Sequence, residues 1–220
     1  MTNEALYLHL ASRRSVRRFR PDEVPRATLR RVLEAAILAP SASNQQPWRF
    51  LVVTSPARRR VMADAVRAVI DQIAARIPEE SQPAFRAYGE YFTRFEHAPV
   101  VIAPLARGLP LLGHLIDEHT PADLRAAVAH VERHSGVVGT SLALQNLLLA
   151  AHAEGLGASA MTGPLLAEAA LRPALAIPPS WTLVALVPMG FPDEAPTRTE
   201  RKRLDHVVRF LDAEGEGDER

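Results

Sequence analysis

The chain has 220 residues, of which 47% are hydrophobic, and its formal net charge is +1 at pH 7. This length and composition suit one sizeable hydrophobic core, so we expect a single domain over residues 1–220. The lack of cysteine in the sequence excludes a disulfide framework, a thiolate zinc site and a catalytic thiol, and it fits a cytoplasmic protein. No apolar run approaches the roughly 20 residues of a membrane span and the N-terminus has no signal-peptide pattern, so we expect no membrane partner.

Two helical patterns in the first part of the chain are separated by an arginine-rich segment. Apolar residues recur at helical spacing over 3–12 and again over 25–38, where Pro25 suits a first helical turn and Pro40 ends the pattern. Eight arginines crowd into residues 13–31. This distribution indicates a site for an anion, and the alternative is a solvated helix face.

The rest of the chain alternates between short apolar strands and longer helical patterns. Apolar runs rich in strand-forming residues predict buried strands over 49–53, 99–105 and 181–190. Helical spacing predicts helices over 56–77, 83–97, 122–134 and 136–155. Because helices dominate and the strands are widely separated, we predict a mixed α+β layer structure rather than repeated βαβ units. The segment 107–121 lacks a clear period and is expected to form a lid or excursion, and residues 211–220 form an acidic tail.

The predicted helix over 136–155 is apolar on nearly all sides, which is typical of a helix buried in the core or in a subunit interface. The stretch that follows it, "GLGASA", has the glycine pattern of a dinucleotide-binding turn. We reject that interpretation because a helix, not a strand, precedes it. We expect instead that Gly155 ends the helix and leads into a strand.

No arrangement of side chains for metal binding or nucleophilic catalysis emerges from the sequence. His130 and His134 have the i, i+4 spacing of helical metal ligands, but Glu132 does not stand next to the first histidine as a zincin helix requires. Ser135 lacks the elbow sequence of a serine hydrolase. We therefore expect no metal and no catalytic side chain.

Three polar segments remain, namely "RRSVR" (13–17), "PSASNQQPW" (40–48) and "ERKR" (200–203). Guanidinium groups bind phosphate oxygens bidentately and a hydroxyl adds one more bond, so arginine and serine in an extended segment can converge on one phosphate. The amide-rich segment supplies donors and acceptors, as the edge of a heterocycle such as a flavin demands. The alternative for that segment is a plain surface turn.

Four stretches of the chain resemble successive signatures of the nitroreductase family of FMN-dependent oxidoreductases. They are "RRSVRRF", "APSASNQQPWRFLVV", "QNLLLAAHAEGLGASAMTGP" and "LVPMGFP", in the family's order and spanning nearly the whole chain. The resemblance implies an α+β, three-layer fold whose mixed, mainly antiparallel sheet is flanked by helices. It also implies an intertwined homodimer with two FMN molecules bound at the subunit interface.

The resemblance further implies which residues bind FMN. The N-terminal motif would hold the phosphate and ribityl chain and place a cation near the flavin N1, and a loop would reach the flavin from the partner subunit. A turn would lie along the isoalloxazine ring, and a C-terminal basic pair would reach the phosphate. In that order the residues are Arg13, Arg14, Ser15 and Arg17; Pro40, Ser41, Ala42, Asn44 and Gln46; Met161, Thr162 and Gly163; and Arg201 and Arg203.

The implied activity is a ping-pong reaction in which NADPH or NADH reduces the flavin and an electron-poor small molecule, such as a nitroaromatic or a quinone, then takes its place. Arg17 is the residue implied to stabilise negative charge near N1. Alternatives are a non-catalytic flavin-binding protein, a dehalogenating enzyme, and the flavin-cleaving synthase of the same superfamily, which tends to have an aspartate where Ser15 stands. A nucleic-acid-binding module built on the arginines fits poorly with the near-zero net charge, so we expect no nucleic-acid partner.

Overall fold

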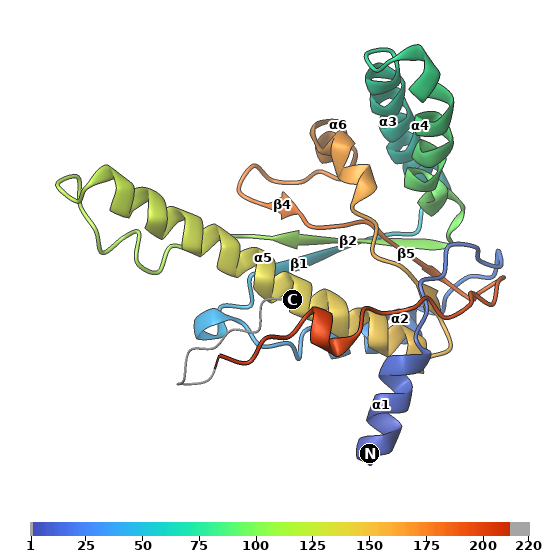
Figure 1. The fold of residues 1–220 in the computed structure, drawn as a ribbon, viewed down its shortest axis with the longest axis horizontal. Coiled ribbons are helices and arrows are strands. Elements are labelled where there is room, and N and C mark those ends of the chain that lie inside the picture. The colour runs from blue at the N-terminus through green and yellow to red at the C-terminus, as the bar shows by residue number, and fades with distance from the viewer. Residues whose placement is uncertain (1, 212–220) are drawn as a thin grey trace.

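The computed structural model describes residues 2–211, and within them a five-stranded sheet lies between two layers of helices (Figure 1). The strands are β1 (Trp48–Val53), β2 (Val100–Ala106), β3 (Gly157–Ala158), β4 (Thr182–Leu183) and β5 (Val187–Gly190). The sheet order is β1-β2-β5-β3, with β4 also pairing with β2, and all of these pairings are antiparallel. The predicted α+β fold with a mainly antiparallel sheet is therefore confirmed.

The run predicted as one strand over 181–190 divides into β4 and β5. Three residues, 184–186, lie opposite two residues of β2, 103–104, because Leu183 pairs with Leu105 and Val187 pairs with Ile102. Within this bulge Leu186 exchanges two backbone hydrogen bonds of 2.9 Å with Met161. Gly155 has the predicted role. It adopts a left-handed conformation (φ 72°), its neighbour Leu156 donates to the carbonyl of Ala151 at 2.8 Å, and β3 follows directly.

The helices are α1 (Asn3–Ser12), α2 (Arg26–Ala36), α3 (Pro56–Ala74), α4 (Gln82–Gly89), α5 (Ala122–Ala153) and α6 (Glu168–Ala174). The helix predicted over 83–97 ends at Gly89 and continues as 3₁₀ turns, and α6 was not predicted. The two helices predicted over 122–134 and 136–155 form one continuous helix, α5. Gly136 lies within this helix, at a point where the backbone of Arg107 approaches it closely. A Cβ at Gly136 would lie 2.6 Å from the carbonyl oxygen of Arg107.

Two hydrophobic clusters bind the layers together. On one side of the sheet Met62 and Val66 of α3 pack with Leu171 of α6 and with Phe95. On the other side α2 and α5 supply Val32, Leu144 and Leu147, which pack on Ile102 and Val187 of the sheet. The core is therefore built separately on each face of the sheet, as in a three-layer fold.

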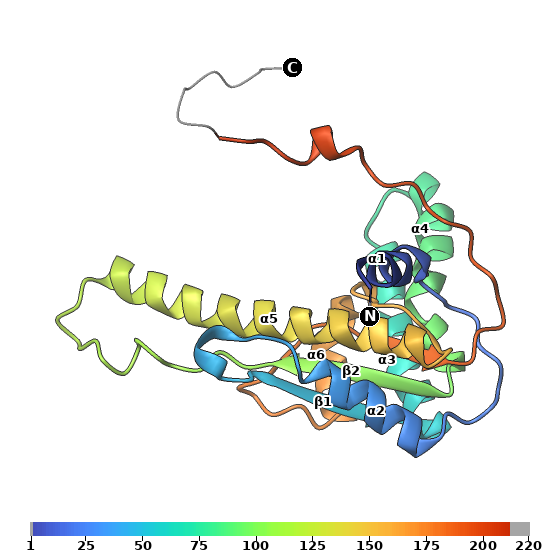
Figure 2. The ribbon, with the colours of Figure 1, turned by 90° about the horizontal axis from the view of Figure 1, so that it is seen from below.

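Helix α5 is only partly covered by the rest of the chain. Its N-terminal half projects beyond the sheet together with the segment 107–121 (Figures 1 and 2). Val131, Val137, Val138 and Leu142 on this helix are exposed. The expectation of burial on all sides is thus wrong for the core of the single chain and leaves a subunit interface as the remaining alternative. By length and composition α5 also meets the criteria for a membrane-spanning helix, with 39% of its most apolar window buried, a test that the core helix of a soluble protein passes as well.

The two ends of the described chain lie outside the hydrophobic core. Helix α1 has no buried residue, and the segment from Thr197 to Leu211 is exposed throughout and extends away from the body of the molecule (Figure 2). Most of the acidic tail predicted over 211–220 lies outside the described residues.

Candidate functional site

The arginine-rich segment 13–17 runs extended beside the edge strand β3. The backbone amide of Val16 donates to the carbonyl of Ala158 at 3.2 Å, and Ser15 forms a parallel bridge with the same residue. The Val16 side chain is buried, and a Cβ on Gly157 would lie 2.6 Å from it, so glycine is required there. Because side chains alternate along an extended segment, Ser15 and Arg17 face away from the side that Val16 occupies.

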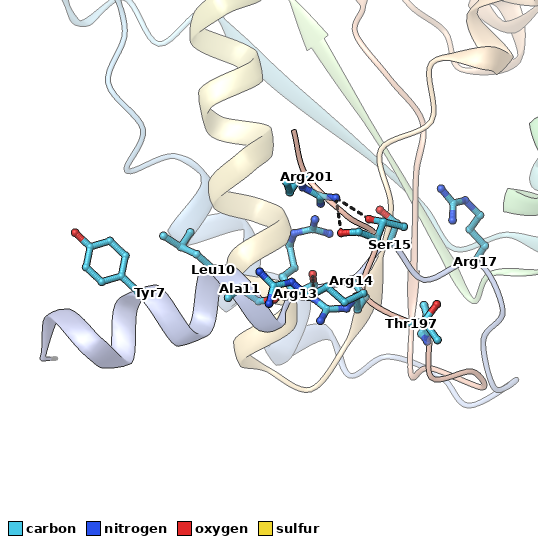
Figure 3. Close-up of a pocket in the computed structure, with 12 residues that line it drawn as sticks. Tyr7, Leu10, Ala11, Arg13, Arg14, Ser15, Arg17, Thr197 and Arg201 are labelled. Atoms are coloured by element: carbon cyan, nitrogen blue, oxygen red, sulfur yellow. Dashed lines mark hydrogen bonds between the residues drawn. The ribbon is translucent and has the colours of Figure 1, made fainter. Parts of the chain in front are cut away.

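A cavity of about 460 Å³ opens between this segment, α1 and the C-terminal arm that begins at Pro196 (Figure 3). The cavity brings together five of the residues assigned to FMN, which are Arg13, Arg14, Ser15, Arg17 and Arg201. The sequence did not indicate the rest of its wall, to which α1 contributes Tyr7, Leu10 and Ala11 and the arm contributes Pro196, Thr197, Arg198 and Thr199. A single site therefore joins the two ends of the chain.

The charges in this cavity favour an anion. Arg14 is held in place by donating to the carbonyls of Ala11 at 2.7 Å and Arg13 at 2.9 Å, and Arg201 donates to the hydroxyl of Thr199 at 2.6 Å. The half-buried guanidinium of Arg13 has no hydrogen bond or carboxylate partner within residues 2–211. Burial, and then repulsion from Arg201 and Arg14, lowers the pKa of Arg13. A bound anion would relieve this repulsion.

Glu194 fixes the far end of the arginine segment. One of its carboxylate oxygens accepts hydrogen bonds from the backbone amides of Arg17 at 2.5 Å and Arg18 at 3.0 Å. Glu194 therefore binds backbone next to the cavity, while the Arg17 side chain lines it. No periodic pattern in the sequence indicates this contact, because it joins positions 177 residues apart.

The loop assigned to FMN over Pro40, Ser41, Ala42, Asn44 and Gln46 lies elsewhere. It contains a 3₁₀ turn (Ala42–Asn44), and Ser41 Oγ accepts from the amide of Gln46 at 2.9 Å. A Cβ on Gly139 of α5 would lie 3.1 Å from the ring of Pro47, so the loop rests closely on that helix. None of its residues lines the arginine cavity. The assigned contacts of this loop with FMN stay a prediction.

The turn assigned to the isoalloxazine ring leads into a 3₁₀ helix (Gly163–Ala167) that lies against α3. Met161 is buried, and its backbone amide is already bonded to Leu186. The next residue, Thr162, is exposed. A Cβ on Gly163 would lie 2.2 Å from the ring of Phe92, so this position has no room for a side chain. Of the C-terminal basic pair, Arg201 lines the arginine cavity, whereas Arg203 pairs with Asp205 at 3.3 Å outside it.

A second, smaller cavity of about 70 Å³ lies between the loop and the segment 107–121. Ala42, Gln45 and Pro47 line it from the loop, and Leu109, Leu111 and Leu112 from the segment. The carboxylate of Glu132 on α5 anchors the segment by accepting from the amides of Leu111 at 2.7 Å, Leu112 at 2.7 Å and Gly113 at 2.9 Å. These bonds lower the pKa of Glu132, with the bond from Gly113 contributing most. The predicted excursion is therefore an irregular segment that one side chain holds against α5.

These features define an α+β protein with a cationic cavity, which is lined by residues near the N-terminus (7–17) and by the C-terminal arm (196–201). The model of the nitroreductase family matches residues 10–191, and the chain belongs to this family. It is 34% identical over 211 residues to an NADH dehydrogenase of Thermus thermophilus, covering 89% of this chain and 91% of the relative. It is 33% identical over 226 residues to a 4-nitrobenzoate reductase of a Nocardioides species, covering 94% and 90%.

A third relative has a different activity. The 5,6-dimethylbenzimidazole synthase of Rhodospirillum rubrum is 34% identical over 192 residues, covering 87% of this chain and 84% of the relative. Among solved structures, a BluB-like flavoprotein from Clostridium difficile has a TM-score of 0.81 at 20% identity, covering 94% of this chain and 99% of that one. An FMN-bound nitroreductase from Desulfitobacterium hafniense has a TM-score of 0.70 at 22% identity, covering 96% and 100%. The similarity to both structures confirms the fold.

Proposed function

We propose that this protein is an FMN-dependent oxidoreductase that uses NADH or NADPH to reduce an electron-poor small molecule, such as a nitroaromatic or a quinone, by a ping-pong mechanism. The observation that carries the proposal is the arginine cavity. The half-buried guanidinium of Arg13, which has no partner among residues 2–211, lines the cavity together with Arg14, Arg17 and Arg201, a donor set that suits a phosphate. The names of the NADH dehydrogenase and nitrobenzoate reductase relatives support the donor and the reaction type.

Arg13 and Arg201 would bind the phosphate of FMN, with a further hydrogen bond from the hydroxyl of Ser15. When bound, FMN supplies hydride-transfer chemistry that amino-acid side chains lack. Arg17 would place its cation where negative charge develops on the ring, since it lines the cavity and its backbone is fixed by Glu194. The protein's own role is thus to hold the cofactor, offset charge and leave one ring face open.

We propose that the working unit is a homodimer. In one chain the loop 40–46 does not reach the arginine cavity, so a second copy must supply it if both groups contact one FMN. Apolar side chains that one chain leaves exposed are available to cover the partner. They lie on α1 (Leu6, Tyr7, Leu8 and Leu10), on α5 (Val137, Val138 and Leu142) and on the C-terminal arm (Leu204, Val207, Phe210 and Leu211).

We propose that the smaller cavity marks the acceptor side of the site. It joins the FMN loop to the leucines of the segment 107–121, so the wall is mainly apolar and suits a flat organic acceptor. Glu132 is occupied in anchoring this wall and leaves the leucines as its contact surface.

Absorbance and turnover test the main proposal. Purified protein should show flavin bands that bleach when NADH or NADPH is added without oxygen and return when a quinone or a nitroaromatic follows. Light scattering on the same sample should give the mass of two chains. A colourless protein that cannot be reconstituted with FMN would overturn the proposal, and flavin bands that no nicotinamide bleaches would favour a non-catalytic flavin-binding protein.

The second candidate function is flavin cleavage to 5,6-dimethylbenzimidazole. The similarity to the synthase of Rhodospirillum rubrum and the fold likeness to the BluB-like flavoprotein favour it, whereas Ser15 in place of an aspartate argues against it. Incubation of the protein with reduced FMN in air, followed by chromatography of the products, distinguishes the two. Formation of dimethylbenzimidazole would replace the reductase proposal, and recovery of intact FMN would retain it.

A further inference from the structure

A small polar cluster ties the end of α1 to the last turns of α5. His9 Nε2 donates to the backbone carbonyl of Leu149 at 3.0 Å, and Ser12 Oγ lies 2.9 Å from Nε2 of His152. The centroids of the two imidazole rings are 4.9 Å apart. Because α1 buries no residue within the described chain, this cluster rather than a hydrophobic face fixes its C-terminal end on α5.

The cluster adjoins the arginine cavity, because Ser12 lies between the lining residues Ala11 and Arg13. Ser12 is the last residue of α1, and its hydroxyl and the backbone amide of Arg13 both donate to the carbonyl of His9, at 3.2 and 3.3 Å. The same helix contributes Tyr7 and Leu10 to the cavity wall. The position of Ser12 therefore fixes the backbone from which the Arg13 side chain enters the cavity wall.

The cations of the cavity act on His152. His9 faces it from α1, and Arg13 and Arg14 face it from the segment that follows. Burial contributes most to lowering the pKa of His152, followed by these three groups. Directly after the helix of His152, the carboxylate of Glu154 is bound by Arg31 of α2 at 2.6 Å. A phosphate bound among the arginines would offset the cations and favour the protonated imidazole.

We propose that Ser12 and His152 are positioning residues for the cofactor phosphate, and that binding of the phosphate is coupled to uptake of a proton by His152. The inference rests on the proposed FMN function. The protonated ring donates a hydrogen bond from Nε2 to Ser12 Oγ. The Ser12 hydroxyl in turn donates its own hydrogen bond to the carbonyl of His9. The proton comes from solvent and stays on the ring while the phosphate is bound. Two hydrogen bonds then reinforce the turn that carries Arg13.

The test compares FMN with riboflavin, which has the same ring and no phosphate. Affinity of the cofactor-free full chain for each is measured by quenching of flavin fluorescence between about pH 6 and about pH 8, the range in which histidine titrates. The variants are His152→Asn, which keeps a hydrogen-bond donor but cannot take the proton, and Ser12→Ala. His130→Asn is the matched control, since His130 is an exposed histidine of the same helix, away from the arginine cavity.

The ratio of wild-type to His152→Asn affinity for FMN is expected to be about fivefold larger at the acid end than at the alkaline end, the low end of usual couplings between sites. For riboflavin the ratio should not depend on pH. Ser12→Ala, like His152→Asn, should reduce the pH dependence of the affinity for FMN. His130→Asn should show the same pH dependence as the wild type. Titration of the FMN phosphate itself, near about pH 6, is common to all variants and cancels in the ratio.

A ratio for FMN that is independent of pH would overturn the inference, and so would an equal pH dependence for riboflavin. The failure of the proposed function looks different. Wild-type protein that binds no FMN at any pH would remove both proposals, whereas tight FMN binding with a flat ratio would remove only the role of His152. If His152→Asn does not fold, the exposed substitution Ser12→Ala decides by the same comparison.

Discussion

Replacing Arg13 with alanine should weaken the binding of FMN without lowering the stability of the cofactor-free protein. The guanidinium of Arg13 is half-buried, makes no hydrogen bond within residues 2–211, and is repelled by Arg201 and Arg14. Its removal should therefore leave the cofactor-free protein unchanged in stability to within about 0.5 kcal/mol, or slightly more stable. A hydrogen bond to a charged group contributes about 1.5–3 kcal/mol, so the same substitution should weaken FMN binding by about 10- to 150-fold.

Equilibrium titration of the cofactor-free protein with FMN measures the loss, and urea denaturation of the same sample measures the stability. Arg58→Ala is the matched control, because Arg58 is an exposed arginine on α3 that does not line the cavity. Arg201→Ala should fall in the same range as Arg13→Ala, while Arg203→Ala should lose less, since Arg203 pairs with Asp205 outside the cavity. Unchanged FMN affinity for Arg13→Ala would refute the phosphate assignment.

Three further substitutions test the packing around the site. Arg59→Ala should lower the free energy of unfolding, measured by urea denaturation, by about 2–4 kcal/mol. The buried guanidinium donates to three backbone carbonyls, which would lose their partners. A loss below about 1 kcal/mol would contradict this reasoning. Gly163→Ala should cost about 1–3 kcal/mol in the same assay, since its Cβ would overlap the ring of Phe92, and a neutral result would show that the ring moves freely. Because the folded-state pKa of Glu132 is lowered, its anchoring of 107–121 is complete at neutral pH and lost as pH falls through that lowered value. Glu132→Gln should therefore raise hydrogen exchange in this segment at neutral pH and converge with the wild type in acid, and equal exchange at neutral pH would refute the anchor.

Local patterns in the sequence predicted the elements whose boundaries are set locally. The helix predicted over 3–12 matches α1, because Thr2 caps it by accepting from the amide of Ala5. Glycine was harder to interpret, since its meaning depends on what lies opposite. Residues 122–134 and 136–155 were predicted as two helices, yet Gly136 lies inside the single helix α5, where it lets the carbonyl of Arg107 approach.

The arginine cavity was predictable from the sequence only in part. The alternation of arginine and serine over 13–17 correctly indicated an extended segment, and Arg201, which the family resemblance assigned to FMN, lines the same cavity as that segment. Tyr7 and Glu194 were missed, because their roles arise from contacts between positions far apart in the sequence. The contacts of the loop 40–46 could not be read from periodicity at all, since the residues that face them in the proposed dimer belong to another copy.

The construction of the cavity from the two ends of the chain has a thermodynamic consequence. Neither α1 nor the C-terminal arm buries a hydrophobic residue within residues 2–211, so few contacts within one chain hold the walls of the cavity in place. A phosphate that contacts arginines from both ends would then join them, and its binding free energy would appear as stability of the assembled site. At a free FMN concentration of about 100 times the dissociation constant this gain is about 2.7 kcal/mol. Because the cations proposed to bind the phosphate would repel one another without it, the residues that would make the site selective for an anion would also make its integrity depend on that anion.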